Sequence, residues 1–237
     1  MIRHDCPQGS DEWLALRLGI PTASEFDRII TPAKLQPAAA ATKYMNLKLA
    51  EWMYGQPLEA FVSPWMERGL ALEAEAVRYY EMERDVETEA VGLITTDDGM
   101  IGASPDRLIV GGRRGCELKC PALETHVGYM LDPASLVAEY RLQVQGQIWV
   151  CELEGSDLMS YYPGFPAVIV SMAPEDRVQA ALAQHVPAFV QTMLACREKL
   201  TAMYGELRRE RVTAEQRTEA SRAAFDEFVD SPIGGVV

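Results

Sequence analysis

The stretch from Gly102 to Cys120 constrains the fold of this chain more than any other, because two β-rich runs flank a Gly-Gly-Arg-Arg-Gly turn. Such a pattern is typical of a β-hairpin. Side chains alternate between the two faces of a strand, so Glu117 and Lys119 point the same way and Leu118 points into the core. Asp106 lies just inside the first strand, and folding of the hairpin brings it beside that pair.

Asp106, Glu117 and Lys119 together suggest a specific chemistry. Two carboxylates offer hard oxygen ligands to a divalent cation, and an ammonium group stands nearby, which suits phosphodiester cleavage. Pro105 directly precedes Asp106, so the spacing matches the PD-(D/E)xK nuclease signature. A Glu-x-Lys pair is also common as solvated charge on an exposed strand, and the flanking segments must decide between the two interpretations.

The composition fits a protein that needs only one domain and does not cross a membrane. With 237 residues, 48% of them hydrophobic, the chain can bury a sizeable core. No run approaches the ~18 apolar residues of a membrane span, and the N-terminus lacks the apolar core of a signal peptide, so we expect a cytoplasmic protein. Five dispersed cysteines without a Cys-x-x-Cys pair argue against a disulfide framework or a zinc ribbon.

The net charge of −13 is unusual for a protein that acts on nucleic acid, because phosphate binding normally requires a basic surface. Two arrangements reconcile the charge with such a function. Carboxylates that hold Mg²⁺ are neutralised by the metal. A fold can also gather its few Lys and Arg side chains into one channel while its outside stays acidic.

The N-terminal region contains two short predicted helices that suit an anion site. Ser10 is a good N-cap for a helix with Arg17 in its last turn. A second helix begins after Thr22, where Glu25 completes a capping-box pattern. The backbone N–H groups of that second start, with Ser24 and Arg17, suit a phosphate. Alternatively, Arg17 caps its own helix and Ser24 is an ordinary first-turn hydroxyl.

Two further predicted helices carry polar candidates. The helix from Trp65 to about Glu83 carries Glu73, which is either a third carboxylate of the site or part of a solvated face. The helix over 134–152 carries Gln143 and Gln147 on a largely apolar surface. A buried amide is costly unless it is hydrogen-bonded, so these amides orient a water or a phosphate oxygen, or they bond a neighbouring backbone.

The remaining elements complete a mixed pattern of helices and strands. We expect a helix over 38–54, a single strand over 86–96, a hairpin of strands over 158–162 and 167–172, and a long helix over 174–204. The helical segment over 206–237 has too little apolar surface to fold alone. We expect it to dock on its own domain or on a neighbouring subunit.

Several motifs, taken in order, resemble the lambda-exonuclease or YqaJ-type viral recombinase nucleases, a branch of the PD-(D/E)xK superfamily. The motifs are Trp13-x-x-x-Arg17-x-Gly19-x-x-Thr22-Ala23-Ser24, Arg68-Gly69-x-x-x-Glu73, Ser104-Pro105-Asp106, Glu117-Leu118-Lys119-Cys120-Pro121, and Gln143-Val144-Gln145 before Trp149. Their joint order favours the nuclease interpretation of the hairpin. The resemblance implies an α/β (α+β) fold with a restriction-endonuclease-like core, a mixed central sheet flanked by helices, in a single nuclease domain over 1–237.

The resemblance also implies a role for each residue of the catalytic group. Asp106 and Glu117 would be metal ligands, together with the backbone carbonyl of Leu118. Glu73 would contribute on the side of a second metal. Lys119 would activate or position the nucleophilic water. A further amide, that of Gln143, would align the water or the scissile phosphate.

Cofactor, substrate and partners follow from the same resemblance. Two Mg²⁺ ions would serve each active site, with Mn²⁺ as a substitute. Arg17, Ser24 and Ser104 would bind the 5′-terminal phosphate of a double-stranded DNA end, and Met66 would either splay the duplex as an apolar wedge or pack in the core. Family members form a homotrimeric ring around the duplex, and a single-strand annealing protein would be the partner.

The leading hypothesis is a Mg²⁺-dependent, processive 5′→3′ double-strand DNA exonuclease. It would release 5′-mononucleotides and leave 3′ overhangs for phage-type recombination by strand annealing, in the cytoplasm of a bacterial or phage-infected cell. One alternative is a structure-specific or restriction-type endonuclease of the same superfamily. Another is a catalytically silent module that binds DNA ends.

Overall fold

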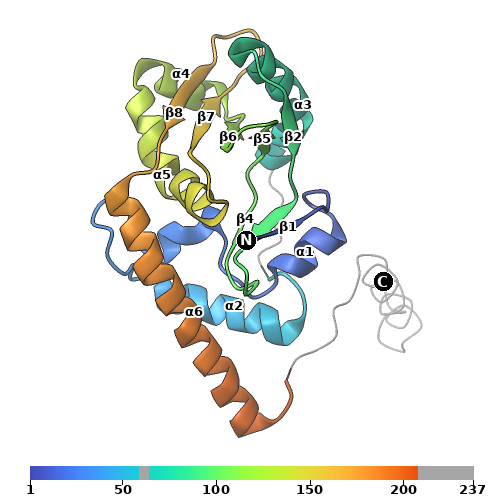
Figure 1. The fold of residues 1–237 in the computed structure, drawn as a ribbon, viewed down its shortest axis with the longest axis vertical. Coiled ribbons are helices and arrows are strands. Elements are labelled where there is room, and N and C mark those ends of the chain that lie inside the picture. The colour runs from blue at the N-terminus through green and yellow to red at the C-terminus, as the bar shows by residue number, and fades with distance from the viewer. Residues whose placement is uncertain (59–63, 208–237) are drawn as a thin grey trace, which may run out of the picture.

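The structure, a computed structural model, describes residues 1–58 and 64–207, the side chains of 64–71 excepted. Its strands are β1 (Ile2–His4), β2 (Thr88–Ala90), β3 (Leu93–Thr95), β4 (Gly102–Ala103), β5 (Arg107–Ile109), β6 (Arg114–Lys119), β7 (Gly155–Ser160) and β8 (Val168–Met172). Its helices are α1 (Asp11–Arg17), the 3-10 helix η1 (Ala23–Arg28), α2 (Ala41–Tyr54), α3 (Pro64–Arg84), α4 (Leu123–Leu131), α5 (Pro133–Val150) and α6 (Asp176–Tyr204). Figure 1 shows their arrangement.

The larger sheet has the strand order β2-β5-β6-β7-β8. β6 and β7 pair in parallel, with Glu117 opposite Leu158, whereas the other neighbours in this sheet are antiparallel. A parallel pair requires a crossover connection, and α4 and α5 provide it. The mixed sheet with its helices confirms the expected fold class, and the predicted hairpins are confirmed as β5–β6 and β7–β8.

Helices cover both faces of this sheet. On one face, Tyr80 of α3 packs in a buried cluster with Leu118 of β6. On the other face, Ile148 of α5 packs with Leu158 of β7. Because neighbouring residues of a strand point to opposite faces, Glu117 is directed toward α5, as the alternation in the sequence predicts.

The smaller sheet, with the order β1-β3-β4, corrects the prediction of one strand over 86–96. That segment is divided into β2 of the larger sheet and β3 of the smaller one. Gly92 lies at the division, where an added Cβ would stand 2.1 Å from the carbonyl oxygen of Cys6. Glycine therefore lets the chain pass close to the N-terminal segment and change sheets.

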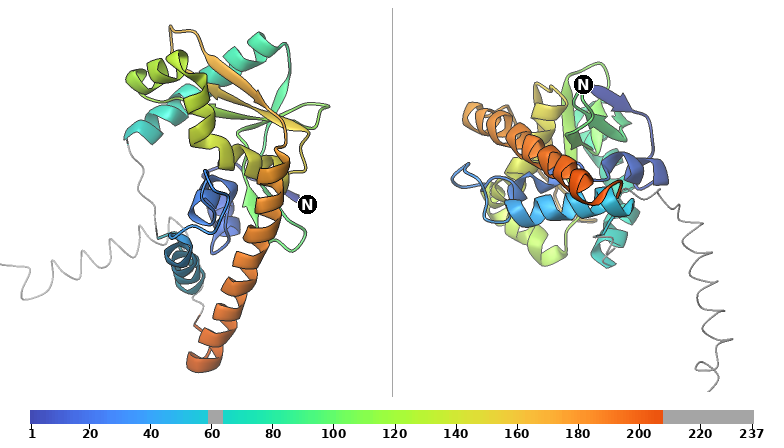
Figure 2. Two further views of the ribbon diagram at one scale, coloured as in Figure 1. Left: turned by 90° about the vertical axis from the view of Figure 1, so that its left-hand side faces the viewer. Right: turned by 90° about the horizontal axis from the view of Figure 1, so that it is seen from below.

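α6 extends away from the larger sheet as a long rod, and it packs against α2 and α5 (Figure 2). The central buried cluster joins η1, α2, α5 and α6 through side chains such as Phe26 and Leu142. Tyr44 of α2 stacks on Phe189 of α6, with ring centroids 5.6 Å apart. Over 1–58 and 64–207, no helix has the length and apolarity to cross a membrane.

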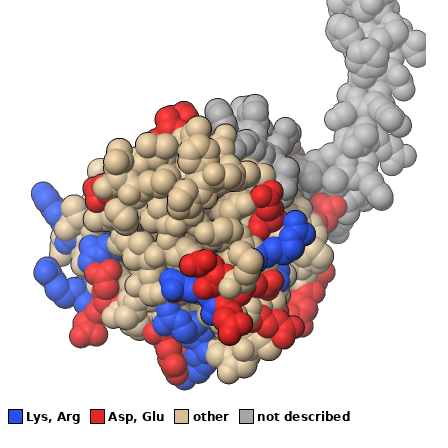
Figure 3. All heavy atoms as spheres, turned by 90° about the horizontal axis from the view of Figure 1, so that it is seen from above, with Lys and Arg blue, Asp and Glu red and all other residues tan. Residues whose placement is uncertain are grey.

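Figure 3 shows the end of the molecule that carries α4 and the β7–β8 turn. Lys and Arg side chains lie among Asp and Glu side chains on one side of this face, and a broad uncharged area covers much of the rest. Apolar side chains exposed at this end include Val127, Met130 and Leu131 of α4. Although the net charge is −13, acidic side chains are therefore not spread evenly over this face.

Candidate active site

The carboxylate of Glu117 is the centre of a hydrogen-bonded group between β6 and α5, and this residue is only 3% exposed. Lys119 Nζ donates to Glu117 Oε1 at 2.7 Å, and Gln143 Nε2 donates to the same oxygen. Gln147 Nε2 donates to Glu117 Oε2 at 2.6 Å. Lys119 Nζ also donates to Gln143 Oε1 at 3.2 Å. The strand and the helix together fix both oxygens of this carboxylate.

The glutamines of α5 point in two directions. Gln143 and Gln147 are four residues apart, which places them on one helix face, and both reach Glu117. Gln145 lies on another face, where its Nε2 donates to the carbonyl of Ala173 at 2.7 Å and its Oε1 accepts from the backbone N–H of Glu175 at 2.9 Å. The site therefore uses two amides, and the third anchors the start of α6.

Asp106 lies directly before β5, which corrects its predicted position just inside the strand, and it is held against β6. Its Oδ2 accepts a hydrogen bond from the backbone N–H of Leu118 at 2.6 Å. The loop that carries Asp106 is fixed from the N-terminal side, because Gln8 Nε2 donates to the carbonyls of Pro105 at 3.0 Å and Val91 at 2.9 Å. The expected approach of Asp106 to the Glu-x-Lys pair is confirmed.

Electrostatics couple the charged groups of this region. Burial raises the pKa of Asp106 well above its ordinary value, and the neighbouring charge of Glu117 raises it further. Burial alone would lower the pKa of Lys119, but the carboxylates of Glu117 and Asp106 outweigh that effect and raise it. Its Nζ lies 4.5 Å from the ring centroid of Tyr140. Lys119 is thus an ammonium that donates hydrogen bonds.

One cleft of about 210 Å³ joins this group to the N-terminal helices. Residues with a predicted role that line it are Arg17, Ser24, Ser104, Asp106, Glu117 and Gln143. Gln147, for which the sequence left two roles open, also lines it, together with Gln8, Trp13, Thr22 and Ala23. Members of the predicted catalytic group and of the predicted phosphate pocket thus line the same cleft. We call the part lined by Asp106 and Glu117 its carboxylate end, and the part lined by Arg17, Ser24 and Ser104 its donor end.

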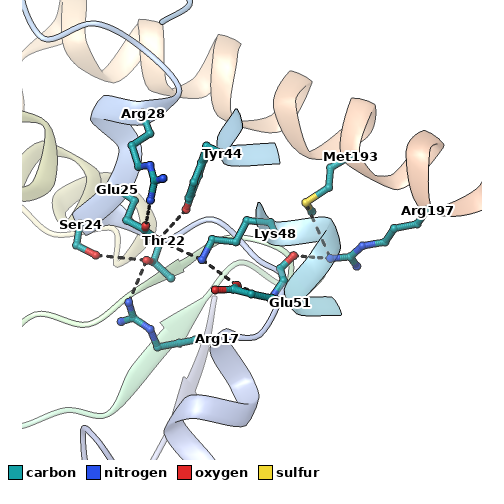
Figure 4. A network of polar contacts seen from close by, with 11 residues as sticks. Arg17, Thr22, Ser24, Glu25, Arg28, Tyr44, Lys48, Glu51, Met193 and Arg197 are labelled. Carbon is teal, nitrogen blue, oxygen red and sulfur yellow. Dashed lines mark hydrogen bonds and ion pairs between the residues drawn. The ribbon is translucent and has the colours of Figure 1, made fainter. Parts of the chain in front are cut away.

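The N-terminal end of the cleft is rich in hydrogen-bond donors (Figure 4). Arg17 Nη2 donates to Thr22 Oγ1 at 3.2 Å, and that hydroxyl lies 3.3 Å from Ser24 Oγ. The guanidinium stacks on Trp13, with Cζ 4.0 Å from the ring centroid. Burial lowers the pKa of Arg17, and the charge of Glu25 opposes this. The described side-chain contacts of Arg17 are thus directed to the cleft and not to the carbonyls of its own helix.

The predicted capping box of Thr22 and Glu25 is wrong. Thr22 precedes a 3-10 helix, and its side chain makes no capping hydrogen bond. Its hydroxyl instead meets Arg17 and Ser24, which belong to the cleft. The carboxylate of Glu25 turns away toward Arg28, at 2.8 Å. Tertiary contacts therefore override the local capping pattern.

A buried ionic cluster supports the turn that carries Arg17 (Figure 4). Lys48 Nζ lies 3.2 Å from Glu25 Oε2 and 3.1 Å from Glu51 Oε2. Glu51 accepts from the backbone N–H of Gly19 at 3.4 Å, and Arg197 of α6 donates to the carbonyl of Gly19. Burial alone would raise the pKa of Glu25, but Lys48 and its hydrogen-bond donors outweigh burial and lower it. The cluster ties the α1–η1 turn to α2 and α6.

Several predicted roles stay predictions, among them those of Glu73, the Leu118 carbonyl, Met66 and the C-terminal segment. The charge of Glu73 helps to raise the pKa of Asp106, yet the described residues contain no group of three His, Cys, Asp or Glu side chains that could hold a metal. Leu118 contacts Asp106 through its N–H, which leaves the role of its carbonyl untested. The side chain of Met66 and the segment 208–237 lie outside the described residues.

The sequence predicts no role for two residues that shape the cleft, Trp13 and Gln8. The two roles left open for Gln147, orienting a water or phosphate oxygen or bonding a neighbouring backbone, do not include its hydrogen bond to Glu117. Trp13 precedes Arg17 by four residues, a spacing that indicates contact along a helix. Gln8 offers no local signal, because its partners Val91 and Pro105 are remote in sequence.

The donor set fits a hard divalent cation. Asp106 and Glu117 line one cleft, and carboxylate oxygens are ligands that Mg²⁺ prefers. Gln147 Oε1 is buried, with no hydrogen-bond partner among the described residues. Burial, and after it the charge of Glu117, raises the pKa of Asp106, so the ionised carboxylate of Asp106 needs a compensating positive charge in the cleft. A bound cation would supply that compensation.

Comparisons with known proteins agree with this geometry. The YqaJ-like viral recombinase domain matches residues 12–154. No curated protein matches the chain. The chain is similar to two solved structures of LHK-Exo, an alkaline exonuclease from Laribacter hongkongensis, and one of these structures is a complex with dAMP. Each is 28% identical to this chain and has a TM-score of 0.73. Each match covers 84% of this chain and 100% of the LHK-Exo chain.

A phage-related exonuclease from Haemophilus somnus 129PT is 13% identical to this chain and has a TM-score of 0.63. The match covers 76% of this chain and 96% of that one, and at this identity it shows the fold alone. The domain match covers more than half of the chain and contains every residue that lines the cleft except Gln8. The chain therefore belongs to the family of YqaJ-like viral recombinase domains.

Proposed function

We propose that this protein is a Mg²⁺-dependent exonuclease that degrades one strand of linear duplex DNA in the 5′→3′ direction. It releases 5′-mononucleotides and leaves 3′ overhangs for recombination by strand annealing. One observation carries the proposal: a single cleft is lined at one end by Asp106 and Glu117 and at the other by Arg17, Ser24 and Ser104. A cation site and an anion pocket in one cleft suit the end of a phosphorylated strand.

The carboxylate end would hold the metal. Asp106 and Glu117, with the carbonyl of Leu118 and the side chain of Glu73, would bind two Mg²⁺ ions. When bound, these ions supply Lewis-acid stabilisation to the attacking and leaving oxygens. Asp106 is fixed for this purpose by the N–H of Leu118, at 2.6 Å.

Side chains around the carboxylates orient the reacting groups. Gln143 and Gln147 hold the two oxygens of Glu117 in one orientation. Lys119, kept protonated by the carboxylates beside it, positions the nucleophilic water and donates to the negative charge that develops on the phosphate. Gln143 lines the cleft and aligns the water or the scissile phosphate.

The donor end sets the direction. Arg17, Ser24 and Ser104 bind the 5′-terminal phosphate through charge-assisted hydrogen bonds. Each cut creates a new 5′-phosphate on the next nucleotide. Binding of that phosphate in the same pocket draws the enzyme forward by one nucleotide, which makes hydrolysis directional and processive.

The comparisons support exonuclease chemistry. LHK-Exo is described as an alkaline exonuclease, and one of its structures contains dAMP. dAMP is a deoxynucleoside monophosphate, the class of product that we propose for this chain. The LHK-Exo structure that contains dAMP matches 84% of this chain, so the match extends beyond the catalytic hairpin and the N-terminal helices.

The function is tested with linear duplexes that carry or lack a 5′-phosphate, in the presence of Mg²⁺. We expect mononucleotide release from phosphorylated ends, no cutting of covalently closed circles, and no reaction after chelation of the metal. Cutting of closed circles would instead support an endonuclease. No hydrolysis with Mg²⁺ or Mn²⁺ would support a silent end-binding module.

Lys119→Ala tests the assignment of the site. We expect this variant to lose hydrolysis while it still binds DNA ends in a gel-shift assay. Lys199→Ala, at an exposed position of α6, is the matched control and should cleave like the wild type. Hydrolysis by Lys119→Ala at the wild-type rate would refute the assignment.

We further propose a homotrimeric ring that threads the duplex, and a single-strand annealing protein as its partner, in the bacterial cytoplasm. Val127, Met130 and Leu131 of α4 are exposed apolar side chains of the kind that subunit contacts bury. Light scattering should give a mass three times that of one chain. A monomeric mass at working concentrations would contradict the ring.

A further inference from the structure

Trp13 connects the groups that define the donor end of the cleft. The guanidinium of Arg17 lies over its ring, with Cζ 4.0 Å from the centroid. Its Nε1 donates to Ser104 Oγ at 3.1 Å and to the carbonyl of Gly92 at 3.1 Å. Arg17 belongs to the same helix as Trp13, whereas Ser104 follows β4. One indole thus contacts donors from two segments that are remote in sequence.

The hydrogen bond from Trp13 determines how the hydroxyl of Ser104 is used. A serine hydroxyl has one proton to donate and two lone pairs that accept. Because Trp13 Nε1 is the donor, Ser104 Oγ is the acceptor in this bond, and its own proton is left for another group. Over the described residues, Ser104 has no second hydrogen-bond partner. A phosphate oxygen in the cleft can accept that proton.

Trp13 acts on Arg17 through its ring. Stacking of a guanidinium on an indole is favourable, and it leaves the N–H donors in the plane of the guanidinium. One of them donates to Thr22 Oγ1 at 3.2 Å. In the part of the chain that the structure describes, no carboxylate forms an ion pair with Arg17. Its remaining donors are therefore available to an anion in the cleft.

We propose that Trp13 is a positioning residue that gives the cleft its preference for a 5′-phosphorylated end over a 5′-hydroxyl end. This specificity role rests on the exonuclease function proposed above. A terminal phosphate carries a charge of about −1.5 to −2 at pH 7 and three acceptor oxygens. Arg17 and Ser104 offer it donors, whereas a 5′-hydroxyl end leaves those donors unpaired.

Trp13→Phe tests the proposal, because phenylalanine keeps an aromatic face for Arg17 and lacks the N–H group. The readout is kcat/KM on a 5′-phosphorylated duplex divided by kcat/KM on the same duplex with a 5′-hydroxyl. We expect this ratio to fall about tenfold, mainly through a higher KM for the phosphorylated duplex. Trp13→Leu removes both contacts and should lower the ratio further. An equal loss on both duplexes would mean a purely structural role and overturn the proposal.

Ser104→Ala provides the second arm of the test. If the indole acts through Ser104, the double variant Trp13→Phe/Ser104→Ala should have nearly the same ratio as Ser104→Ala alone. Two effects that multiply independently would refute the action through Ser104. A wild-type ratio near one is a different result, because it contradicts end recognition in the proposed function itself.

Discussion

The two ends of the cleft are built by opposite means. At the carboxylate end, acceptors come from the central sheet, and Glu117 is held by Lys119 of its own strand and by amides of α5. At the donor end, Arg17 and Ser24 come from a short helix and a 3-10 helix, whose connection is held by ion pairs of α2 and by Arg197 of α6. The carboxylate end is thus supported by a paired strand of the central sheet, and the donor end is supported by buried ion pairs.

Each end also contains its own counter-charge. Lys119 forms an ion pair with Glu117 at the carboxylate end. At the donor end, the negative charges of Glu25 and Glu51 raise the pKa of Arg17 and so oppose the effect of burial. In the proposed function, the separation of acceptors and donors would orient a strand that has a phosphate at its terminus and another at its scissile bond. A chain of net charge −13 can thus recognise DNA locally, without a basic surface overall.

The largest effect is expected at the carboxylate end. Glu117→Gln removes a charge that a cation requires, and metal assistance is worth several kcal/mol, so single-turnover hydrolysis should fall by about three orders of magnitude. Glu124→Gln, at an exposed carboxylate of α4, is the control. A loss of less than about tenfold would show that Glu117 does not hold the metal.

Gln147→Leu tests the support of that carboxylate. Groups that orient a metal ligand typically contribute about 10- to 100-fold, so we expect a loss of that size together with a higher Mg²⁺ requirement. The measurement is the rate as a function of Mg²⁺ concentration. Binding of Mn²⁺, followed by calorimetry, should weaken in parallel.

Gln145→Leu is the matched control for this variant, because it makes the same change on another face of α5. Its amide bonds Ala173 and Glu175, so its loss should cost about 1–3 kcal/mol of stability and lower Tm by several degrees. Its Mg²⁺ requirement should stay that of the wild type. Equal Mg²⁺ profiles for the two variants would argue against a specific role of Gln147.

At the donor end, Arg17→Lys keeps the charge and loses the planar fork. One charge-assisted hydrogen bond is worth about 1.5–3 kcal/mol, so kcat/KM on 5′-phosphorylated duplex should fall about tenfold or more. The 5′-hydroxyl duplex should be affected less. Arg177→Lys, at an exposed position of α6, is the control, and equal loss on both duplexes would contradict a phosphate contact.

The smallest effect concerns the stability of the donor end in acid. The pKa of Glu25 is lowered in the folded state, so its ionised form stabilises the fold above the ordinary carboxyl pKa, and this contribution is lost as pH falls through the folded value. Tm of the wild type should decrease between about pH 5 and pH 3, where carboxyl groups titrate. Glu25→Gln should show a lower Tm near neutrality and a shallower decrease. Parallel curves would show that Glu25 is not linked to folding.

The two ends also differ in how well the sequence predicts them. The hairpin and the position of Glu117 follow from the two-residue period of a strand, and the convergence of Gln143 and Gln147 follows from helical spacing. These are local regularities. The sequence therefore predicted both the sheet that carries the carboxylates and the helix that covers them.

Long-range contacts explain what the sequence did not predict. The strand over 86–96 divides because Gly92 passes close to Cys6, and no pattern within the strand reports that approach. The capping box failed because Arg17, from the preceding helix, binds the hydroxyl of Thr22. The pairing of Lys48 with Glu25 depends on how α2 docks against η1, which local periodicity does not specify.

The exposed turn at Gly111 and Gly112 divides the chain into two parts that each supply residues of the site. Residues before it supply Arg17, Ser24, Ser104 and Asp106, whereas residues after it supply Glu117, Lys119 and both glutamines. A polypeptide cut at this turn would give two fragments, each with half of a cleft. The enzyme is thus naturally suited to fragment complementation, in which DNA degradation would report that the halves have been brought together.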